Sequence, residues 1–381
     1  FMARLWTRNL ISNLLDNHPS RDISMHQRYR HVVVAGAGPS LDLGIQLLKE
    51  CRSAYFLVAV DTAIPSLVRQ NIIPDLIVAV EGQIANLRDF IPGGLDYPAL
   101  AFDLTSTPMI PRQIRCDTLW HFDSEYAPGR HWDELASLGW PVTRIPPLGS
   151  VGVVALYLCR HLCDAHVHII GLDFAWQAGA THAVDSPSQL AQFSSARRLS
   201  SQSGETASLQ AHAQVLPGVG EGKPEYSDHV LGAYRDSLDE AIGMLRQQGL
   251  QVHDLRSRGL PLSAQPIKPD GFRQLLADDC PSPIIRTSKP EKGLVDQGGP
   301  GRVWLAGLVD RMDVCQTLIQ HELRHPGKGS DNGQKILLGL EELDFLFLDI
   351  PDADWPTLDP GALTRALIIL DYYRSFILQR F

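Results

Sequence analysis

The sequence lacks features that mark several well-known functional classes. It has no run of about 18 apolar residues, the length that a membrane-spanning helix needs, so we predict no membrane span. It has no block rich in Lys and Arg, and its net charge is −9. A general nucleic-acid binder needs clustered basic residues, so we expect no nucleic-acid partner. The opening residues do not resemble a signal peptide, and we expect a cytoplasmic protein.

Cysteine is scarce and scattered, and no Cys-x-x-Cys pair occurs, which argues against a zinc ribbon. The six cysteines are Cys51, Cys116, Cys159, Cys163, Cys280 and Cys315. Their apolar neighbours are typical of reduced core residues, as in a cytosolic protein.

What the sequence does have is an alternation of short apolar runs and amphipathic stretches. The apolar runs predict strands at His31–Val34, Tyr55–Val60, Leu76–Val80, Ala99–Phe102, Thr118–Phe122, Val167–Ile170 and Val252–Leu255. Helical periodicity occurs at Leu41–Glu50, Ile64–Gln70, Val151–Leu162 and Tyr226–Gln248. Such alternation is typical of βαβ units. We therefore predict an α/β fold with a Rossmann-like, mostly parallel sheet flanked by helices.

Composition divides the chain further. Residues 1–29 are predicted to be a helical lead-in that packs on the main domain, which spans 30–265. Within that domain, residues 183–226 have few large apolar side chains and are predicted to be a mobile loop. Residues 266–301, rich in Pro, Gly and Lys, are predicted to be a linker. Residues 302–381 are predicted to be a mainly helical C-terminal region.

A glycine turn, Gly36-Ala37-Gly38-Pro39-Ser40, stands between a predicted strand and a predicted helix. Such a turn lets backbone N–H groups approach a phosphate at the positive end of the helix dipole. Asp42 stands near the usual place of the third glycine of the dinucleotide fingerprint, and no Gly-Lys-Ser/Thr occurs. Neither a standard NAD site nor a Walker loop is therefore supported. A tight turn without a ligand is the alternative.

Other polar residues follow the predicted strands, where ligands of open α/β sheets bind. Asp61 ends the second strand, where it either faces a ribose or caps the next turn, and Glu81 ends the third. Gly149-Ser150-Val151-Gly152 opens a helix and offers further free N–H groups.

Asp173 ends the Val167–Ile170 strand, and His182 follows in the next loop. A carboxylate and a histidine near one sheet edge are suited to acid–base chemistry. A solvated loop histidine without a role is the alternative.

Several segments occur in the order of a known family: Val33–Leu41, Val60–Ala63, Ile73–Val78, Gly149–Val151, Ile170–Ala175, Thr181–Ala183 and Tyr226–Leu262. Together they resemble the domain shared by Maf motility accessory proteins, which are flagellin glycosyltransferases, and MptE-like 6-hydroxymethylpterin diphosphokinases. The loop and the Gly171–Ala175 segment are also similar to the GNGPSL and GIDFY segments of bacterial sialyltransferases. Ala37 replaces the asparagine of that loop.

The resemblance implies a transferase, foremost a Maf-like enzyme that moves a nonulosonic (sialic-type) acid from a CMP donor to Ser or Thr of flagellin. Such an enzyme requires no metal cofactor. The implied nucleotide-binding residues are Gly36, Ala37, Gly38, Pro39, Ser40, Asp61, Thr62, Glu81, Gly149 and Ser150. The implied catalytic residues are His182, as the base that activates the acceptor, and Asp173. The candidates for binding the sugar carboxylate are Arg130, Arg144, Arg197 and Arg198.

Two alternatives remain open. An MptE-like diphosphokinase would use ATP, with Mg²⁺ positioned by Asp173, Asp61 or Glu81, because hard cations prefer oxygen ligands. A non-catalytic nucleotide-binding scaffold of flagellar assembly would instead use residues 302–381 to dock a partner.

A competing motif lies outside the resemblance. His321-Glu322-Leu323-Arg324-His325 matches H-E-x-x-H, which binds zinc when both histidines share one helix face. Glu341 or Glu342 would be a third ligand. Pro326 follows at once, so the second histidine stands at a helix end, and we favour a polar helix end over a zinc peptidase.

Overall fold

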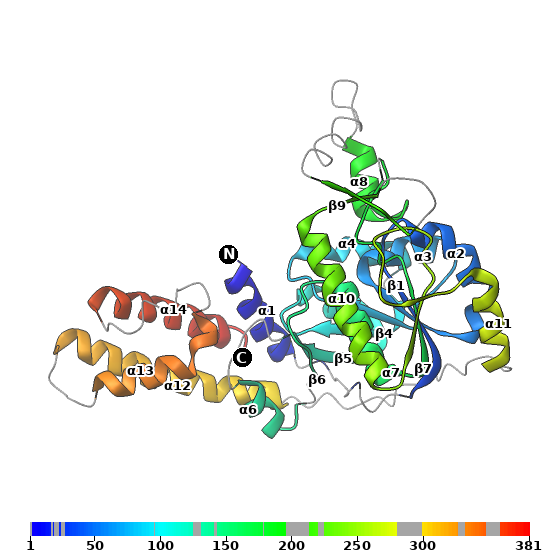
Figure 1. The fold of residues 1–381 in the computed structure, drawn as a ribbon. Coiled ribbons are helices and arrows are strands. Elements are labelled where there is room, and N and C mark those ends of the chain that lie inside the picture. The colour runs from blue at the N-terminus through cyan, green and yellow to red at the C-terminus, as the bar shows by residue number, and fades with distance from the viewer. Residues whose placement is uncertain are drawn as a thin grey trace.

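The structure is a computed structural model with one large sheet and two groups of helices (Figure 1). It describes residues 2–16, 18, 23, 27–94, 96–124, 131–140, 143–177, 179–195, 213–219, 225–279, 299–326, 332–347 and 359–381. The sheet has nine strands in the order β11-β10-β7-β1-β2-β3-β4-β5-β6. Every neighbouring pair is parallel, which confirms the predicted α/β fold.

All of the predicted strands form. Their bounds are β1 (Tyr29–Ala35), β2 (Phe56–Val60), β3 (Leu76–Ala79), β4 (Asp96–Asp103), β5 (Arg115–Asp123), β7 (Cys163–Ile170) and β10 (Gln251–Asp254). The two-residue edge strands β6 (Thr143–Arg144) and β11 (Gln265–Pro266) are too short to leave a sequence signal. Apart from Arg30 near the start of β1, the central strands are buried along their length, as expected when helices cover both faces of a parallel sheet.

The strand order reverses beside β1. From β1 the chain adds β2 to β6 on one side, and it then returns to place β7, β10 and β11 on the other side. Such a reversal opens a crevice beyond the carboxyl ends of the two strands that flank it. The fold therefore directs a ligand to the ends of β1 and β7.

Helices on both faces supply the main core. Helices α7 (Val151–Leu162) and α10 (His229–Gln247) pack on each other, while α2 (Ser40–Glu50) and α11 (Pro269–Asp279) share the opposite face (Figure 1). Shorter helices in the connections are α3 (Ile64–Arg69), α4 (Leu87–Phe90), α5 (Met109–Gln113) and α6 (His131–Ser137). The five described cysteines are free thiols, as predicted, and three of them are buried.

Helix α11 overturns part of the predicted linker. It lies within 266–301, yet it buries Phe272 and Leu276 in the main core, where the Phe272 ring lies 6.2 Å from that of Tyr55. The first part of the range therefore belongs to the main domain, because two well-placed apolar residues are enough to dock a short helix. Residues 280–298 lie outside the described residues.

The predicted mobile loop 183–226 contains regular elements. Helix α8 (Pro187–Ser195) follows its start, and β8 (Gln214–Leu216) pairs with β9 (Glu225–Ser227) in a two-stranded antiparallel sheet. Residues 196–212 and 220–224 lie outside the described part, so the prediction of mobility has no test there.

The N-terminal helix joins the C-terminal helices. Helix α1 (Met2–Asp16) ends well before the predicted residue 29 and packs with α12 (Pro300–Arg324) and α14 (Pro360–Leu378), while α13 (Asn332–Glu342) packs on α12 (Figure 1). This second core includes Leu10, Leu14, Trp304, Leu308 and Leu370. No helix in the described ranges has the length and apolar character needed to cross a membrane.

Helix α1 also reaches the main domain through two buried asparagines. Asn9 Nδ2 donates to the carbonyls of Gly82 and Thr105, at 2.9 Å each. Asn13 Nδ2 donates to those of Leu104 and Ser106, at 2.8 and 3.0 Å. Because these carbonyls follow β3 and β4, α1 connects the sheet to the helical region.

We predict that Asn13→Ala lowers the free energy of unfolding by about 2 kcal/mol, because two buried carbonyls lose their donor. Urea denaturation followed by circular dichroism measures this loss. Gln46→Ala, at an exposed amide of α2, is the control and should change stability by less than about 0.5 kcal/mol. Equal stability of the two variants would contradict the connecting role of α1.

Candidate functional site

A cavity of about 430 Å³ lies beyond the carboxyl ends of β1 and β7, in the size range of small-ligand sites. Among the sequence-predicted residues, it brings together Gly36, Ala37, Gly38, Thr62, Ser150, Asp173 and His182. It does not include Pro39, Ser40, Asp61, Glu81 or Gly149 in its lining. The location agrees with the crevice that the strand order predicts.

The glycine turn packs directly against the loop that follows β7. Gly36 N donates to Ile170 O at 2.9 Å, and Gly38 N donates to Gly171 O at 2.7 Å. A Cβ at Gly36 would stand 2.4 Å from Gly171 O, so the two backbones approach too closely for a side chain. The glycines thus serve loop-to-loop packing, and in this geometry their N–H groups are not free for a phosphate.

Ser40 and Asp173 join the same two loops. Asp173 accepts a hydrogen bond from Ser40 N at 2.7 Å and another from Ser40 Oγ, so both carboxylate oxygens have donors. Ser40 Oγ in turn accepts from Gly171 N at 3.0 Å. Burial raises the pKa of Asp173 to about 6. This geometry makes Asp173 the link between the first residue of helix α2 and the loop after β7, and the support of the cavity floor.

His182 stands at the cavity on a loop that the glycine turn anchors. Ala183 N donates to Ala37 O at 2.7 Å, and His182 N donates to Gln189 Oε1 at 3.3 Å. The Nδ1 atom of His182 lies 3.2 Å from Thr181 Oγ1. Burial lowers the pKa of the ring below its ordinary value of 6.5, so the imidazole is neutral at pH 7 and able to accept a proton.

The amino end of α7 supplies N–H groups to the cavity. Ser150, Val151 and Gly152 line it, and among the described residues no side chain caps this helix. Gly149 turns the chain into the helix at φ +70°, and a Cβ there would stand 2.9 Å from Tyr234. An uncapped helix start with a positive dipole end is suited to one anionic group.

Neither Asp61 nor Glu81 lines the cavity. Asp61 is buried, where its oxygens accept from Thr62 N at 2.8 Å and Asn86 Nδ2 at 2.7 Å. Burial raises the pKa of Asp61 to about 6. Glu81 lines a separate hollow of about 200 Å³ that also contains Asn86 and Asp89. The geometry thus gives Asp61 the alternative role of holding a turn.

The aromatic wall of the cavity was not predicted from the sequence. Phe174, Trp176 and Tyr234 line it. Phe174 adopts φ +52°, a strained conformation for a residue with a side chain, and such strain is common at functional sites. The indole N–H of Trp176 is buried and has no hydrogen-bond partner among the described residues. The signal for this wall in the sequence was the pair of aromatic residues, Phe174 and Trp176, that closely follows the end of β7.

Cations are scarce around the cavity. Of the described residues that line it, none is Lys or Arg. Arg256 is fully buried close by, where it pairs with Asp254 at 2.8 Å and donates to Leu172 O at 2.7 Å. Arg144 forms an exposed ion pair with Asp133, and Arg130, Arg197 and Arg198 lie outside the described residues.

The H-E-x-x-H motif ends helix α12, as its proline predicts. The rings of His321 and His325 lie 5.3 Å apart, and both residues are exposed. Within the described chain, neither Glu341 nor Glu342 joins them in a metal-binding group.

We predict that Gly38→Ala destabilises the protein by roughly 1–3 kcal/mol, because the new Cβ would stand 2.6 Å from Asp173 Oδ2. Gly232→Ala in α10 is the matched control, since a Cβ there meets nothing within 4 Å. It should raise stability by about 0.5 kcal/mol or more, as alanine favours a helix. Thermal unfolding of both variants measures the contrast, and a neutral Gly38→Ala would contradict the packing described above.

Known proteins resemble the chain in part. Residues 7–179 match the model of the family described as 6-hydroxymethylpterin diphosphokinase MptE-like. Two uncharacterized proteins of Treponema pallidum (strain Nichols) are similar. One is 31% identical over 187 residues, covering 48% of this chain and 32% of that protein. The other is 30% identical over 82 residues, covering 21% of this chain and 39% of that protein.

A solved structure is also similar to the chain. A MAf glycosyltransferase from Magnetospirillum magneticum AMB-1 aligns with a TM-score of 0.49 and 16% identity. The alignment covers 99% of this chain and 54% of that one, so the chain spans about half of that protein and about a third of the first curated relative. The match to the MptE-like family model rests on the sequence of residues 7–179, which are less than half of the chain.

Proposed function

We propose that the protein is a transferase that takes its transferred group from a nucleotide bound in the cavity between the ends of β1 and β7. Three observations support this proposal: the MptE-like family of residues 7–179, the cavity at the reversal of strand order, and the uncapped start of α7. The location of the cavity carries most of the weight, because nucleotides bind at this point in open parallel sheets.

The charges around the cavity favour a donor with a single phosphate. The lining contains Asp173 and Asp228 but no described Lys or Arg. The start of α7 provides about half a positive charge, which suits one phosphodiester better than a triphosphate. A CMP-linked sugar has one such phosphate. The donor we propose is therefore a CMP-linked sugar; that the sugar is a nonulosonic acid, and that the acceptor is Ser or Thr of flagellin, rests on the resemblance alone.

In this proposal, His182 is the general base. The acceptor hydroxyl oxygen attacks the anomeric carbon, the bond from that carbon to the phosphate oxygen breaks, and CMP leaves with the bonding electrons. The hydroxyl proton passes to the imidazole of His182, which burial keeps neutral beforehand. Thr181 Oγ1, 3.2 Å from His182 Nδ1, orients the ring. Asp173 acts indirectly by holding the glycine turn under the donor.

The second candidate is a diphosphokinase, which the description of the family model favours. That reaction needs Mg²⁺ on ATP, and the carboxylates predicted to hold it do not fit. Both oxygens of Asp173 have donors in Ser40, Asp61 has two partners of its own, and Glu81 lines another hollow. A Mg²⁺-dependent response to ATP would nevertheless overturn the proposed donor.

We predict that CMP stabilises the protein and that Ser150→Asp abolishes this effect. At about 100 times its dissociation constant, CMP should add roughly 2.7 kcal/mol, measured by thermal shift. Aspartate is a good first residue for a helix, so Ser150→Asp should fold at least as well while its charge repels the phosphate. Ser150→Ala is the control and should keep the response, because Ser150 makes no capping bond.

The outcomes of this panel are distinct. A shift with ATP and Mg²⁺ but not with CMP would favour the diphosphokinase. A shift with neither ligand would leave a scaffold as the better account. A CMP response that survives Ser150→Asp would show that the phosphate binds away from α7.

We predict that His182→Gln lowers the transfer rate by about 10²–10⁴-fold while CMP still binds, since glutamine cannot accept the proton. For the wild type, the rate should fall as pH decreases through the pKa of His182, which lies below 6.5, because protonation removes the base. CMP release from the sugar donor measures both effects. His229→Gln, at an exposed histidine at the start of α10, is the matched control. A full rate in His182→Gln would remove this residue from the mechanism.

A further inference from the structure

Four buried histidines gather on one face of the sheet, away from the cavity. His31 lies on β1, His166 and His168 on β7, and His253 on β10. The parallel register pairs His31 with His166 and His253 with His168, so all four side chains project to the same side. This is the side of helix α11, because the Phe272 ring contacts His168 at 4.8 Å. The cavity, by contrast, lies beyond the carboxyl ends of these strands.

The imidazoles are paired through their ring nitrogens. His31 Nδ1 lies 3.1 Å from His168 Nε2, and His166 Nδ1 lies 3.1 Å from His253 Nε2. Burying a polar ring is costly unless its nitrogens have partners, and apolar residues usually occupy such positions in a parallel sheet. Packing alone therefore does not explain why four histidines occupy buried positions on these strands.

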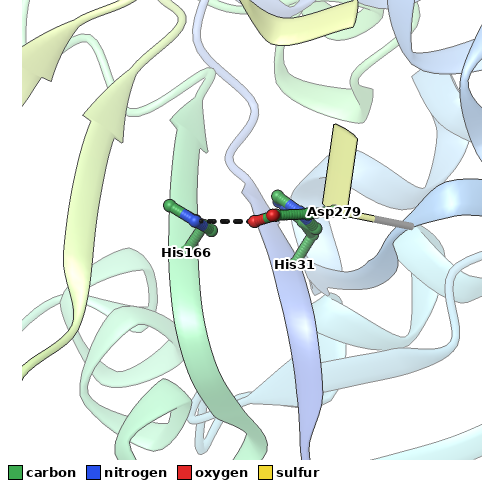
Figure 2. Close-up of side chains that lie close together, drawn as sticks. All are labelled: His31, His166 and Asp279. Carbon is green, nitrogen blue, oxygen red and sulfur yellow. Dashed lines mark ion pairs between the residues drawn. The ribbon is translucent and has the colours of Figure 1, made fainter. Parts of the chain in front are cut away.

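The remaining Nε2 atoms of two rings converge on one carboxylate. Asp279, the last residue of α11, has its Oδ2 3.0 Å from His166 Nε2 and 3.5 Å from His31 Nε2 (Figure 2). The three ligand atoms lie within 4.8 Å of one another. A tetrahedral zinc ion bound at about 2.0 Å keeps its ligand atoms roughly 3.3 Å apart, so small side-chain rotations would complete the geometry.

We propose that His31, His166 and Asp279 bind a divalent transition-metal ion of the zinc class. Two imidazoles and one carboxylate are a donor set that suits such ions. As far as the described residues go, the fourth position is left to water, because the Asp279 side chain is 24% exposed while both rings are buried. The ion would attach α11 to the two strands at the centre of the sheet.

The other two histidines support this assignment. A ligand histidine in a metal site donates its second ring N–H to a neighbour, which fixes the tautomer. His168 Nε2 and His253 Nε2 are placed to accept these protons from His31 and His166.

One native cation competes for the carboxylate. Arg30 Nη2 lies 3.1 Å from Asp279 Oδ2, and the Arg30 side chain is about half exposed. A side chain exposed to this degree has solvent into which it can turn when a metal binds. Removal of the Arg30 side chain should therefore strengthen metal binding. If the cluster were only a network of ion pairs, the same removal would weaken that network.

The test is calorimetric titration of the full chain with Zn²⁺, with Co²⁺ as the spectroscopic probe. The proposal expects one site, a tetrahedral Co²⁺ spectrum and a higher melting temperature with Zn²⁺. Asp279→Asn keeps the size of the side chain, and it should lower the affinity by about tenfold or more and remove the thermal shift. Asp270→Asn, at an exposed position on the same helix, is the matched control and should bind as the wild type does.

Two more variants make the result decisive. Arg30→Gln should bind Zn²⁺ at least as tightly as the wild type. His321→Ala, in the exposed pair at the end of α12, should leave the site intact. Absence of Zn²⁺ binding, or binding that survives Asp279→Asn but disappears in His321→Ala, would overturn the proposal. Neither result would affect the proposed transferase function, because that site is elsewhere.

Discussion

The contact between two strand-end loops is the constraint on which the proposed site depends. The turn after β1 donates Gly36 N and Gly38 N to the carbonyls that end β7, and Ser40 shares its hydrogen bonds with Asp173. This arrangement draws the two loops together at the point where the strand order reverses. It also orients α2, sets the floor of the cavity and anchors the His182 loop through Ala37.

The central sheet was predictable because its strands are continuous apolar runs, such as Phe56–Val60, that need burial on both faces. The glycine turn was also predictable, but its packing against the loop after β7 was not. A sequence does not show which carbonyl will accept a hydrogen bond from a given backbone N–H. Asp61 illustrates the same limit, since its partner Asn86 comes from a later turn. Helix α11 was not predicted, because few of its residues are apolar. The buried ones, Phe272 and Leu276, are recognisable as core residues only once the main core is known.

The histidine cluster could not be read from the sequence for a topological reason. His31 and His166 are far apart in the chain and become neighbours only because β7 returns to lie beside β1. Parallel register then decides which side chains share a face.

The net charge of the chain is likewise a poor guide to the cavity. The chain is acidic overall, but a nucleotide responds to the local electrostatic field. At the cavity, the positive end of the α7 dipole opposes the negative charges of Asp173 and Asp228.

Helix α1 has a consequence for how the protein is synthesised. Its apolar residues Leu10 and Leu14 pack against α12 and α14, and Ser12 Oγ accepts a hydrogen bond from Arg380 at 2.7 Å. Those partners emerge from the ribosome only after the entire sheet has been made. Until then the apolar side chains of α1 stay exposed to solvent. Exposed apolar surface makes the nascent chain prone to aggregation and a natural client for chaperones.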